Sequence, residues 1–336
     1  MIQSVSVAQK IRIWWDSARW VALPNSGMPC ILGGLIAFSD GSFNLVRFVI
    51  AFFGVMAVHL GTNLLDDYAD LKIGGFSLRD KVQKIEDKGV RTIKAPYVVD
   101  GTIRLNHVLY FSLALFAVGI AAGVYLTIAS GWPVAVIAIL GAIICFFYSM
   151  PPLSLCYHGM GEMVVGLAMG PGICLGTYYA VAQSFSWTPV LIGITIGCLV
   201  GLVLYVHSIM DFKPDLAAKK KTVVAYIGDR QKAIKLLPVI LAVAYGTVIL
   251  GILLRVLPPA TLLVFLSLPM AIKLIQLMNR LGKGDYGETK LTWWMGPMEQ
   301  MIEGLEWFLI RWRLARNLMM TITLLIFIAY AVELAF

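Results

Sequence analysis

The sequence predicts an all-α polytopic membrane protein with nine transmembrane helices, arranged as two four-helix units in parallel repeat plus one C-terminal helix. Of its 336 residues, 59% are hydrophobic and only 14% are charged, with a mean hydropathy of +0.82, whereas roughly a quarter of a soluble domain is charged. Apolar runs close to the ~20 residues that cross a bilayer as a helix recur along the chain. Two similar acidic clusters stand 144 residues apart, measured from Asp67 to Asp211.

The apolar runs must be helical, because only helices and closed barrels satisfy the backbone in lipid and these runs are too long for barrel strands. The nine expected spans are residues 22–39, 46–65, 106–128, 132–150, 160–182, 188–208, 236–255, 257–278 and 316–335.

The acidic clusters define an internal repeat. The offset between them covers four expected crossings and aligns the second span with the sixth, so both spans cross in the same direction. This is a parallel repeat. We expect one intramembrane domain over residues 1–336, with halves at about 20–155 and 156–300 and a last helix at 316–335.

Basic residues orient the bundle. Segments on one side of the expected spans hold 25 of the 27 Lys and Arg residues, and Arg47 and Arg255 remain on the other. The positive-inside rule then predicts a multi-pass protein of the cell (inner) membrane with a cytoplasmic N-terminus. Nine crossings put the C-terminus outside, and both acidic clusters face the cytoplasm. The net charge of +8 follows from this bias, so nucleic acid is an unnecessary partner.

Segments outside the spans predict surface attachment. Basic residues and tryptophans alternate over Lys10–Trp20, which is typical of an interfacial helix. Aromatic residues over Met298–Trp312 predict a second interfacial segment. The first twenty residues lack the apolar stretch of a cleavable signal. The five cysteines lie in or beside apolar runs without metal-ligand spacing, so we expect no disulfides.

The first acidic cluster, residues 63–70 (NLLDDYAD), carries candidate metal ligands on one helical face. Asn63, Asp67 and Asp70 stand at i, i+4 and i+7, with Asp66 flanking them. Carboxylates beside lipid cost free energy, so they are functional candidates by default.

The second cluster, residues 207–215 (HSIMDFKPD), repeats the pattern. His207 and Asp211 share a helical face. Pro214 disfavours helix at the preceding residue, so we expect Asp215 just past the helix end. His207 is either a metal ligand or a structural residue at the helix end.

Carboxylates from two helices repel unless a cation lies between them. Mg²⁺ prefers oxygen ligands and commonly bridges one or two carboxylates to substrate phosphates. Lys219, Lys220 and Lys221 follow the second cluster and can bind anions as point charges. The two clusters therefore predict a metal-bridged diphosphate site. The alternative is that the acids merely end their spans.

A third stretch, residues 148–162, joins the fourth and fifth spans on the cytoplasmic side. Pro151 and Pro152 stop the fourth span, and a series of glycines from Gly159 to Gly176 predicts close packing of the fifth. Glu162 begins that helix, where it either acts functionally or favourably meets the helix dipole.

Together these features resemble the UbiA-type intramembrane aromatic prenyltransferases over nearly the whole chain. Within that superfamily, three stretches look most like 1,4-dihydroxy-2-naphthoate prenyltransferases: residues 23–33, residues 63–70 with Gly74, and residues 157–162 running on to 176–179. The chain departs from the usual pattern in having Asp66 in place of Asn, His207 and Met210 in place of Asn and Arg, and Lys219 in place of Gly.

The resemblance implies roles for individual residues. It assigns Mg²⁺–diphosphate binding to Asp67, Asp70, Asp211 and Asp215, with Asp66 as a further candidate ligand. It places Asn63 and Lys220 beside the diphosphate, and Tyr148 and Ser149 in the same cavity, where Tyr148 could stabilise a prenyl cation through its π face. With Met210 in the arginine position, a carboxylate of the acceptor needs another basic partner, and Arg91 and Lys94 are candidates. Glu162 completes the predicted substrate-binding set.

The expected function is Mg²⁺-dependent transfer of a polyprenyl group from its diphosphate to 1,4-dihydroxy-2-naphthoate, with loss of CO₂ and formation of a demethylmenaquinone. The expected partners are polyprenyl diphosphate, an aromatic acceptor and the lipid bilayer. One alternative is a prenyltransferase of this type with another acceptor, such as a hydroxybenzoate, a futalosine-pathway intermediate or a glycerol phosphate. A membrane transporter is the other alternative, although transporter acids lie near the midplane rather than at helix ends.

Overall fold

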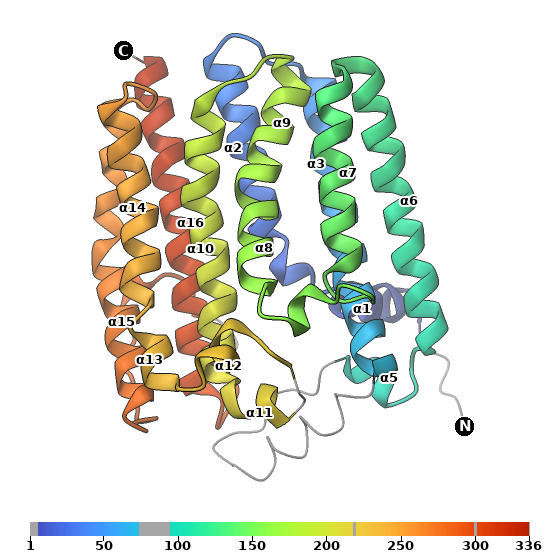
Figure 1. Ribbon diagram of the computed structural model, residues 1–336, viewed down its shortest axis with the longest axis vertical. Helices are drawn as coiled ribbons and strands as arrows, with labels where there is room; N and C mark the ends of the chain where they lie inside the picture. The colour runs from blue at the N-terminus through green and yellow to red at the C-terminus, as the bar shows by residue number, and fades with distance from the viewer. Residues whose placement is uncertain (1–5, 74–94, 218–219, 299–300, 336) are drawn as a thin grey trace.

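A computed structural model describes residues 6–73, 95–217, 220–298 and 301–335. Its long helices run side by side as one bundle, with α1 at one end and the last turn of the C-terminal helix at the other (Figure 1). Seven helical segments in the described ranges are long and apolar enough to cross a membrane. They are α3 (Leu45–Ile73), α6 (Leu105–Ser130), α8 to α9 (Gly161–Leu167 and Ile173–Ala182, joined by the π-helical turn η3, Ala168–Gly172), α10 (Trp187–Met210), α13 to α14 (Arg230–Ile234 and Leu237–Leu253), η4 to α15 (Pro259–Ser267 and Leu268–Gly282) and α16 (Glu306–Ala335).

The two other expected spans correspond to shorter helices. Helix α2 (Pro24–Ser39) and helix α7 (Trp132–Phe147) have 16 residues each and run alongside the longer helices (Figure 1). Both begin with proline in the first turn, where its missing N–H leaves no helical bond unmade. The polytopic all-helical fold is confirmed, and the count of nine crossings stays a prediction.

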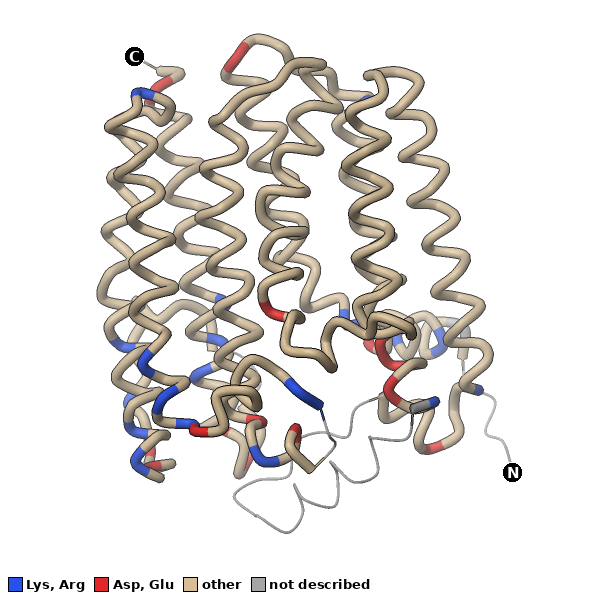
Figure 2. Tube along the Cα trace, viewed as in Figure 1, with Lys and Arg blue, Asp and Glu red and all other residues tan. Residues whose placement is uncertain are grey.

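Short elements lie at the α1 end of the bundle. Helix α1 (Val7–Ser17) confirms a helix within the Lys10–Trp20 region, and the turn η1 (Trp20–Ala22) leads from it into α2. The remaining short elements of this end are α5 (Pro96–Val99), η2 (Leu155–Tyr157), α11 (Phe212–Ala217), α12 (Val223–Ile227) and η5 (Trp293–Met295). Lys and Arg residues gather at this end (Figure 2), as the charge bias predicted.

The second half of the expected interfacial segment over Met298–Trp312 forms part of the last long helix, and its place at a membrane surface stays a prediction. Helix α16 begins at Glu306, ten residues before the expected start of the last span. The reason lies in Arg311, whose fully buried guanidinium donates to the backbone carbonyls of Leu277 (3.1 Å), Asp285 (3.3 Å) and Trp307 (2.5 Å). Because these carbonyls satisfy the charged group, the apolar helix can start before it.

Helix boundaries near the acidic clusters agree with expectation in the main points. Helix α3 continues to Ile73, so the whole first cluster is helical as expected. Helix α10 ends at Met210 and Asp215 lies past that end, but a new helix, α11, includes Lys213, where helix was expected to be disfavoured. Pro214 fits there because it stands in the first turn of this new helix, where a backbone N–H has no helical partner.

Glycines bring η3, which continues α8, into close contact with α10. A Cβ added to Gly170 would lie 2.3 Å from the Gly193 carbonyl oxygen and 2.4 Å from Gly197 Cα. Only a residue without a side chain allows this approach, as the glycine series in the fifth expected span predicted. At the start of α8 the two helices are also close, because a Cβ added to Gly201 of α10 would lie 3.3 Å from the Glu162 carbonyl oxygen.

Candidate functional site

The first acidic cluster lies in the last turns of α3, inside the protein. Asp67 and Asp70 are 3% and 5% exposed, and Asp66 is buried as well. Burying a carboxylate without partners costs several kcal/mol or more, so these groups must be paired.

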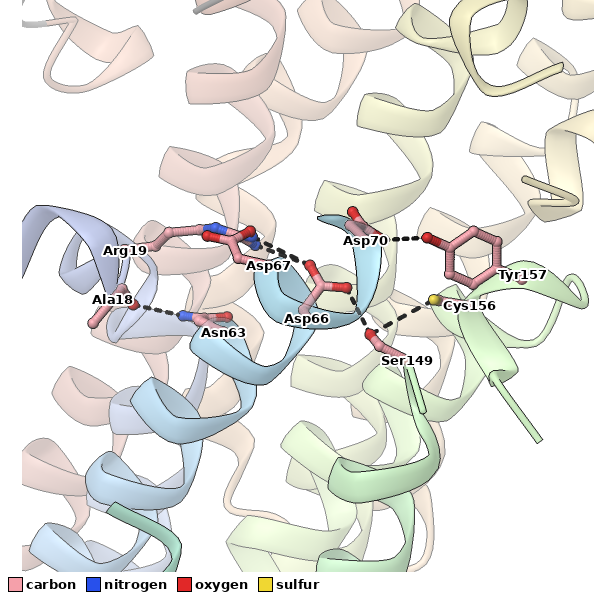
Figure 3. A network of polar contacts seen from close by, with 9 residues as sticks. All are labelled: Ala18, Arg19, Asn63, Asp66, Asp67, Asp70, Ser149, Cys156 and Tyr157. Carbon is pink, nitrogen blue, oxygen red and sulfur yellow. Dashed lines mark hydrogen bonds and ion pairs between the residues drawn. The ribbon is translucent and has the colours of Figure 1, made fainter. Parts of the chain in front are cut away.

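Side chains of Arg19, Ser149 and Tyr157, from other segments, contact this cluster (Figure 3). The Arg19 guanidinium pairs with both Asp66, at 3.2 Å, and Asp67. Ser149 donates to the second oxygen of Asp66 at 2.6 Å, and the Tyr157 hydroxyl donates to Asp70. Asp66, expected as a possible metal ligand, is thus held between Arg19 and Ser149.

Asn63 reaches out of the helix on the same side. Its amide donates to the backbone carbonyl of Ala18 at 3.0 Å (Figure 3). This bond attaches α3 to the chain just before Arg19, so it helps to place Arg19 over the two aspartates.

The second acidic cluster is equally buried, because Asp211 and Asp215 are each 3% exposed. Asp211 follows the last residue of α10, and its backbone carbonyl accepts the N–H of Asp215 at 2.8 Å. His207 Nδ1 lies 3.4 Å from the Asp211 carboxylate. One turn of backbone therefore holds both carboxylates in a fixed relation.

Glu162 supports α10 rather than standing apart as a separate acid. Its carboxylate accepts a hydrogen bond from Ser208 at 2.8 Å, and both residues are buried. Since Ser208 is three residues before Asp211, this bond fixes the end of α10 relative to α8. Glu162 was expected to bind substrate, and the structure places it in this helix–helix contact.

The segment 148–160 lies between the two clusters. Ser149 and Tyr157 contact the first cluster, as described above, and His158 forms an isolated parallel bridge with Lys221 behind the second. The Lys220 ammonium lies 5.6 Å from the centre of the Tyr157 ring. Residues that are far apart in the sequence thus meet at one end of the bundle.

Lys220 interacts electrostatically with aspartates of both clusters. Its backbone N–H donates to the Asp215 carbonyl at 2.9 Å. Desolvation lowers the pKa of the Lys220 ammonium, but Asp70, Asp66 and Asp215 outweigh it, so the pKa is raised above its ordinary value. Lys220 therefore stays charged and faces carboxylates of both clusters.

Tyr157 remains a hydrogen-bond donor beside Lys220. Desolvation and the neighbouring Asp70 carboxylate raise the pKa of its phenol. Among the described residues, Tyr157 and Arg19 are contacts of the first cluster that sequence reasoning missed. The signals were present, because Tyr157 lies in one of the stretches that carried the resemblance and Arg19 ends the interfacial segment just before the first span.

Aromatic and cationic side chains surround the outer side of the second cluster. The His207 ring meets Phe308 edge-on at 5.3 Å, Phe308 meets Trp307 at 5.7 Å, and Trp307 meets Tyr286 at 5.0 Å between ring centres. Arg230 then reaches the Tyr286 hydroxyl at 3.4 Å. The early start of α16 thus places Trp307 and Phe308 next to the site.

The candidate metal ligands are of the type that Mg²⁺ prefers. They are carboxylate oxygens of buried aspartates in the two acidic clusters. No group of three or more His, Cys, Asp or Glu side chains is close enough to hold a metal within the ranges the structure describes. Mg²⁺ commonly uses one or two carboxylates and completes its shell with water and substrate phosphates. The arrangement suits an ion that arrives with a diphosphate better than a resident structural ion.

The remaining predicted residues lie in two places. Tyr148 follows the last residue of α7 and directly precedes Ser149, which contacts the first cluster, and Met210 is buried in the core. Arg91, Lys94 and Lys219 lie outside the described residues.

Comparison with known proteins identifies the family. Residues 27–294 match the UbiA prenyltransferase family. The chain belongs to this family. The resemblance drawn from the acidic clusters is confirmed, and the protein is a prenyltransferase. A transporter does not fit this membership.

The relatives of this UbiA family member include naphthoate prenyltransferases. It is 27% identical over 265 residues to the 1,4-dihydroxy-2-naphthoate octaprenyltransferase of Bacillus subtilis, covering 79% of this chain and 81% of that one. It is 29% identical over 220 residues to the enzyme of the same name from Mycobacterium tuberculosis, covering 64% and 70%. A UbiA homologue from Archaeoglobus fulgidus bound to GPP and Mg²⁺ shares the fold, with a TM-score of 0.54, 14% identity, and coverage of 94% and 99%.

Proposed function

We propose that this UbiA-type protein transfers a polyprenyl group from polyprenyl diphosphate to 1,4-dihydroxy-2-naphthoate, with Mg²⁺ as cofactor and with loss of CO₂, to give a demethylmenaquinone. The observation that carries the proposal is the joining of two buried aspartate clusters by Lys220 and the 148–160 segment, at the basic end of an apolar bundle. A diphosphate needs cations on several sides, and an isoprenoid tail needs an apolar environment.

Asp67, Asp70, Asp211 and Asp215 would hold Mg²⁺. When bound, the ion supplies positive charge that stabilises the departing diphosphate. Lys220 adds a fixed charge from the protein, already oriented between the clusters, and such preorganised groups contribute most to stabilising charge that develops in a transition state. Tyr157 orients Lys220 and Asp70.

Arg19 has a place in the same scheme. Its guanidinium lies over Asp66 and Asp67, and an arginine fork can bind two oxygens of a carboxylate or phosphate at once. Negative charge brought by a diphosphate gives Arg19 a second anionic partner beside the first cluster. Tyr148, next to Ser149, supplies a π face for positive charge on the allylic carbon.

The choice of acceptor rests on relatives and on three sequence stretches. Two relatives are named 1,4-dihydroxy-2-naphthoate octaprenyltransferases, and the 157–162 stretch forms the connection between the clusters. Met210 is buried in the core and carries no charged group, so this position cannot bind the acceptor carboxylate as an arginine would. We propose that a basic residue elsewhere holds the acceptor carboxylate, with Arg91 and Lys94 as candidates.

We further propose nine crossings, with α2 and α7 completing the seven long spans, and two repeat halves at about 20–155 and 156–300. The N-terminus and the active site would face the cytoplasm and the C-terminus the outside. Support comes from the concentration of Lys and Arg at the end that also carries both acidic clusters (Figure 2).

Product analysis by mass spectrometry tests the function. Membranes containing the protein would receive geranylgeranyl or a longer polyprenyl diphosphate, with Mg²⁺ and a panel of aromatic acids. We expect a prenylated naphthoquinol lacking the carboxylate, and no product after Mg²⁺ is removed with EDTA. Asp100→Asn, a change of an exposed acid at the same end, serves as the unaffected control.

The acceptor choice has its own variant. Met210→Arg restores the residue usual at this position, and we expect it to leave dihydroxynaphthoate as the acceptor, because selection rests on other residues. Transfer to hydroxybenzoate or glycerol phosphate, with none to dihydroxynaphthoate, would show that the acceptor is wrong while the prenyl transfer stands.

A further inference from the structure

A buried histidine lies deeper in the bundle, beyond the diphosphate site. His59 is in the middle of α3 and is 5% exposed, and its Nδ1 lies 2.6 Å from the hydroxyl oxygen of Ser26 on α2, which is fully buried. An ionisable side chain inside a membrane-spanning bundle is costly and marks a candidate functional site. Neither the acidic clusters nor the proposed diphosphate contacts use it.

His59 continues the polar face of α3. At 100° per residue, His59, Asn63, Asp66 and Asp70 project within about 60° of one another around the helix axis. At 1.5 Å per residue, His59 stands about 6 Å from Asn63 and about 10 Å from Asp66 along the axis. One continuous stripe thus runs from the first acidic cluster into the bundle, and His59 is its deepest titratable member.

The partners of Ser26 are compatible with an accepting tautomer of His59. The Ser26 hydroxyl lies 3.2 Å from the Leu23 carbonyl oxygen, which also accepts the backbone N–H groups of Ser26 and Gly27. When the hydroxyl donates to this carbonyl, the Ser26 oxygen accepts from His59 Nδ1–H. Nε2 is then unprotonated and able to accept, and the described part of the chain gives it no hydrogen-bond partner.

We propose that His59 Nε2 accepts the proton of a ring hydroxyl of the aromatic acceptor, an inference that rests on the proposed function. The position suits this role, because an acceptor ring must lie on the apolar side of the diphosphate, where the allylic carbon emerges. In this proposal Ser26 donates to the Leu23 carbonyl and accepts from Nδ1–H, which holds the imidazole in the accepting tautomer.

The proposed step balances. The hydroxyl proton moves to Nε2 as a ring carbon forms a bond to the allylic carbon, and the allylic C–O bond breaks with its electron pair leaving on the diphosphate. Loss of CO₂ from the carboxylate returns an electron pair to the ring, and the proton on Nε2 returns to the ring oxygen. His59 ends the cycle neutral.

A purely structural role is the alternative, in which His59 and Ser26 only attach α3 to α2. Two matched controls separate the roles. Ser112, also fully buried, donates to the Gly61 carbonyl of the same helix at 2.7 Å and carries no imidazole, so Ser112→Ala measures the loss of one buried hydroxyl contact to α3. His107 is exposed at the start of α6, so His107→Gln controls for replacing a histidine.

The experiment compares His59→Gln with both controls, and measures the thermal midpoint, the affinity for geranylgeranyl diphosphate with Mg²⁺, and kcat for phenolic acceptors of graded hydroxyl acidity. We expect kcat to fall by about 10² to 10⁴, the usual contribution of a general base, with donor affinity unchanged. The fall should shrink as the acceptor hydroxyl becomes more acidic. Ser26→Ala should show a smaller fall with the same trend.

Three results would overturn the inference: a kcat within threefold of wild type for His59→Gln, a fall independent of acceptor acidity, or a parallel loss of donor affinity and thermal midpoint. Wild-type turnover reports on the proposed function separately. A wild-type protein that prenylates a phenol while His59→Gln does so equally well refutes the role of His59 alone.

Discussion

The close contact between η3 and α10 makes Gly170→Ala a sharp test of how the site is held. The new Cβ would lie 2.3 Å from the Gly193 carbonyl oxygen, and ordinary contact begins near 3.4 Å, so the helices must separate by about 1 Å. Overpacking of this kind costs about 1 to 3 kcal/mol. A 1 Å misplacement can lower turnover about 10²-fold.

The separation would reach the site through α8, which is continuous with η3 and whose Glu162 accepts a hydrogen bond from Ser208 of α10. The control is Gly246→Ala in α14, where an added Cβ meets nothing within 4 Å. Gly246→Ala adds the same methyl group to another long helix. Because alanine favours helix more than glycine, we expect the free energy of unfolding to stay unchanged or to rise by about 0.5 to 1 kcal/mol.

The assay measures the thermal midpoint in lipid nanodiscs and prenyl transfer below that midpoint. We expect Gly170→Ala to unfold at a lower temperature than Gly246→Ala and to turn over about 10²-fold more slowly while folded. Equal midpoints and equal turnover for the two variants would refute the reasoning that this contact positions the second cluster.

The other predictions concern charge and orientation. Asp67→Asn or Asp211→Asn should lower turnover at least about 10²-fold, as loss of one electrostatic group does, while the protein still inserts; near-normal activity at saturating Mg²⁺ contradicts the shared site. Lys220→Met should weaken donor binding about tenfold or more, since a hydrogen bond to a charged group contributes about 1.5 to 3 kcal/mol. Lys221→Met changes an exposed side chain and should leave donor binding unchanged. An equal loss of donor binding in both variants would show that Lys220 has no special role. With native cysteines replaced, Ser184→Cys should react with an impermeant thiol reagent from outside intact cells; reaction only after permeabilisation reverses the topology.

Much of the fold could be predicted because lipid leaves the backbone few choices. Runs of apolar residues near 20 long must be helices, and seven of the nine expected spans are long helices. Charge segregation along the chain likewise follows from composition alone. The boundaries were harder, because a helix end depends on partners that the local sequence does not show. Helix α16 starts early because Leu277 and Asp285 offer carbonyls to Arg311 from a separate helix and loop.

The candidate site likewise has features that the local sequence predicts and contacts that it does not. Periodicity placed Asn63, Asp67 and Asp70 on one side of a helix, and burial of these aspartates agrees with it. The pairing of Arg19 with Asp66 joins residues 47 positions apart and has no local signal. Contacts of this kind arise from packing between segments, which the sequence specifies only through the whole fold.

Position along the chain also matters for how the bundle forms. Helix α16 packs on both α10 and α2, so one face of α2, an early helix of the chain, is covered by the last helix made. Chains grow at about 5 to 20 residues per second, so α16 is synthesised on the order of tens of seconds after α2. During that interval the Trp307 and Phe308 rings have not yet reached His207. Completion of the site is therefore a late event in biosynthesis, and a ribosome stalled before residue 306 would leave an inserted bundle that lacks the side chains around its second aspartate pair.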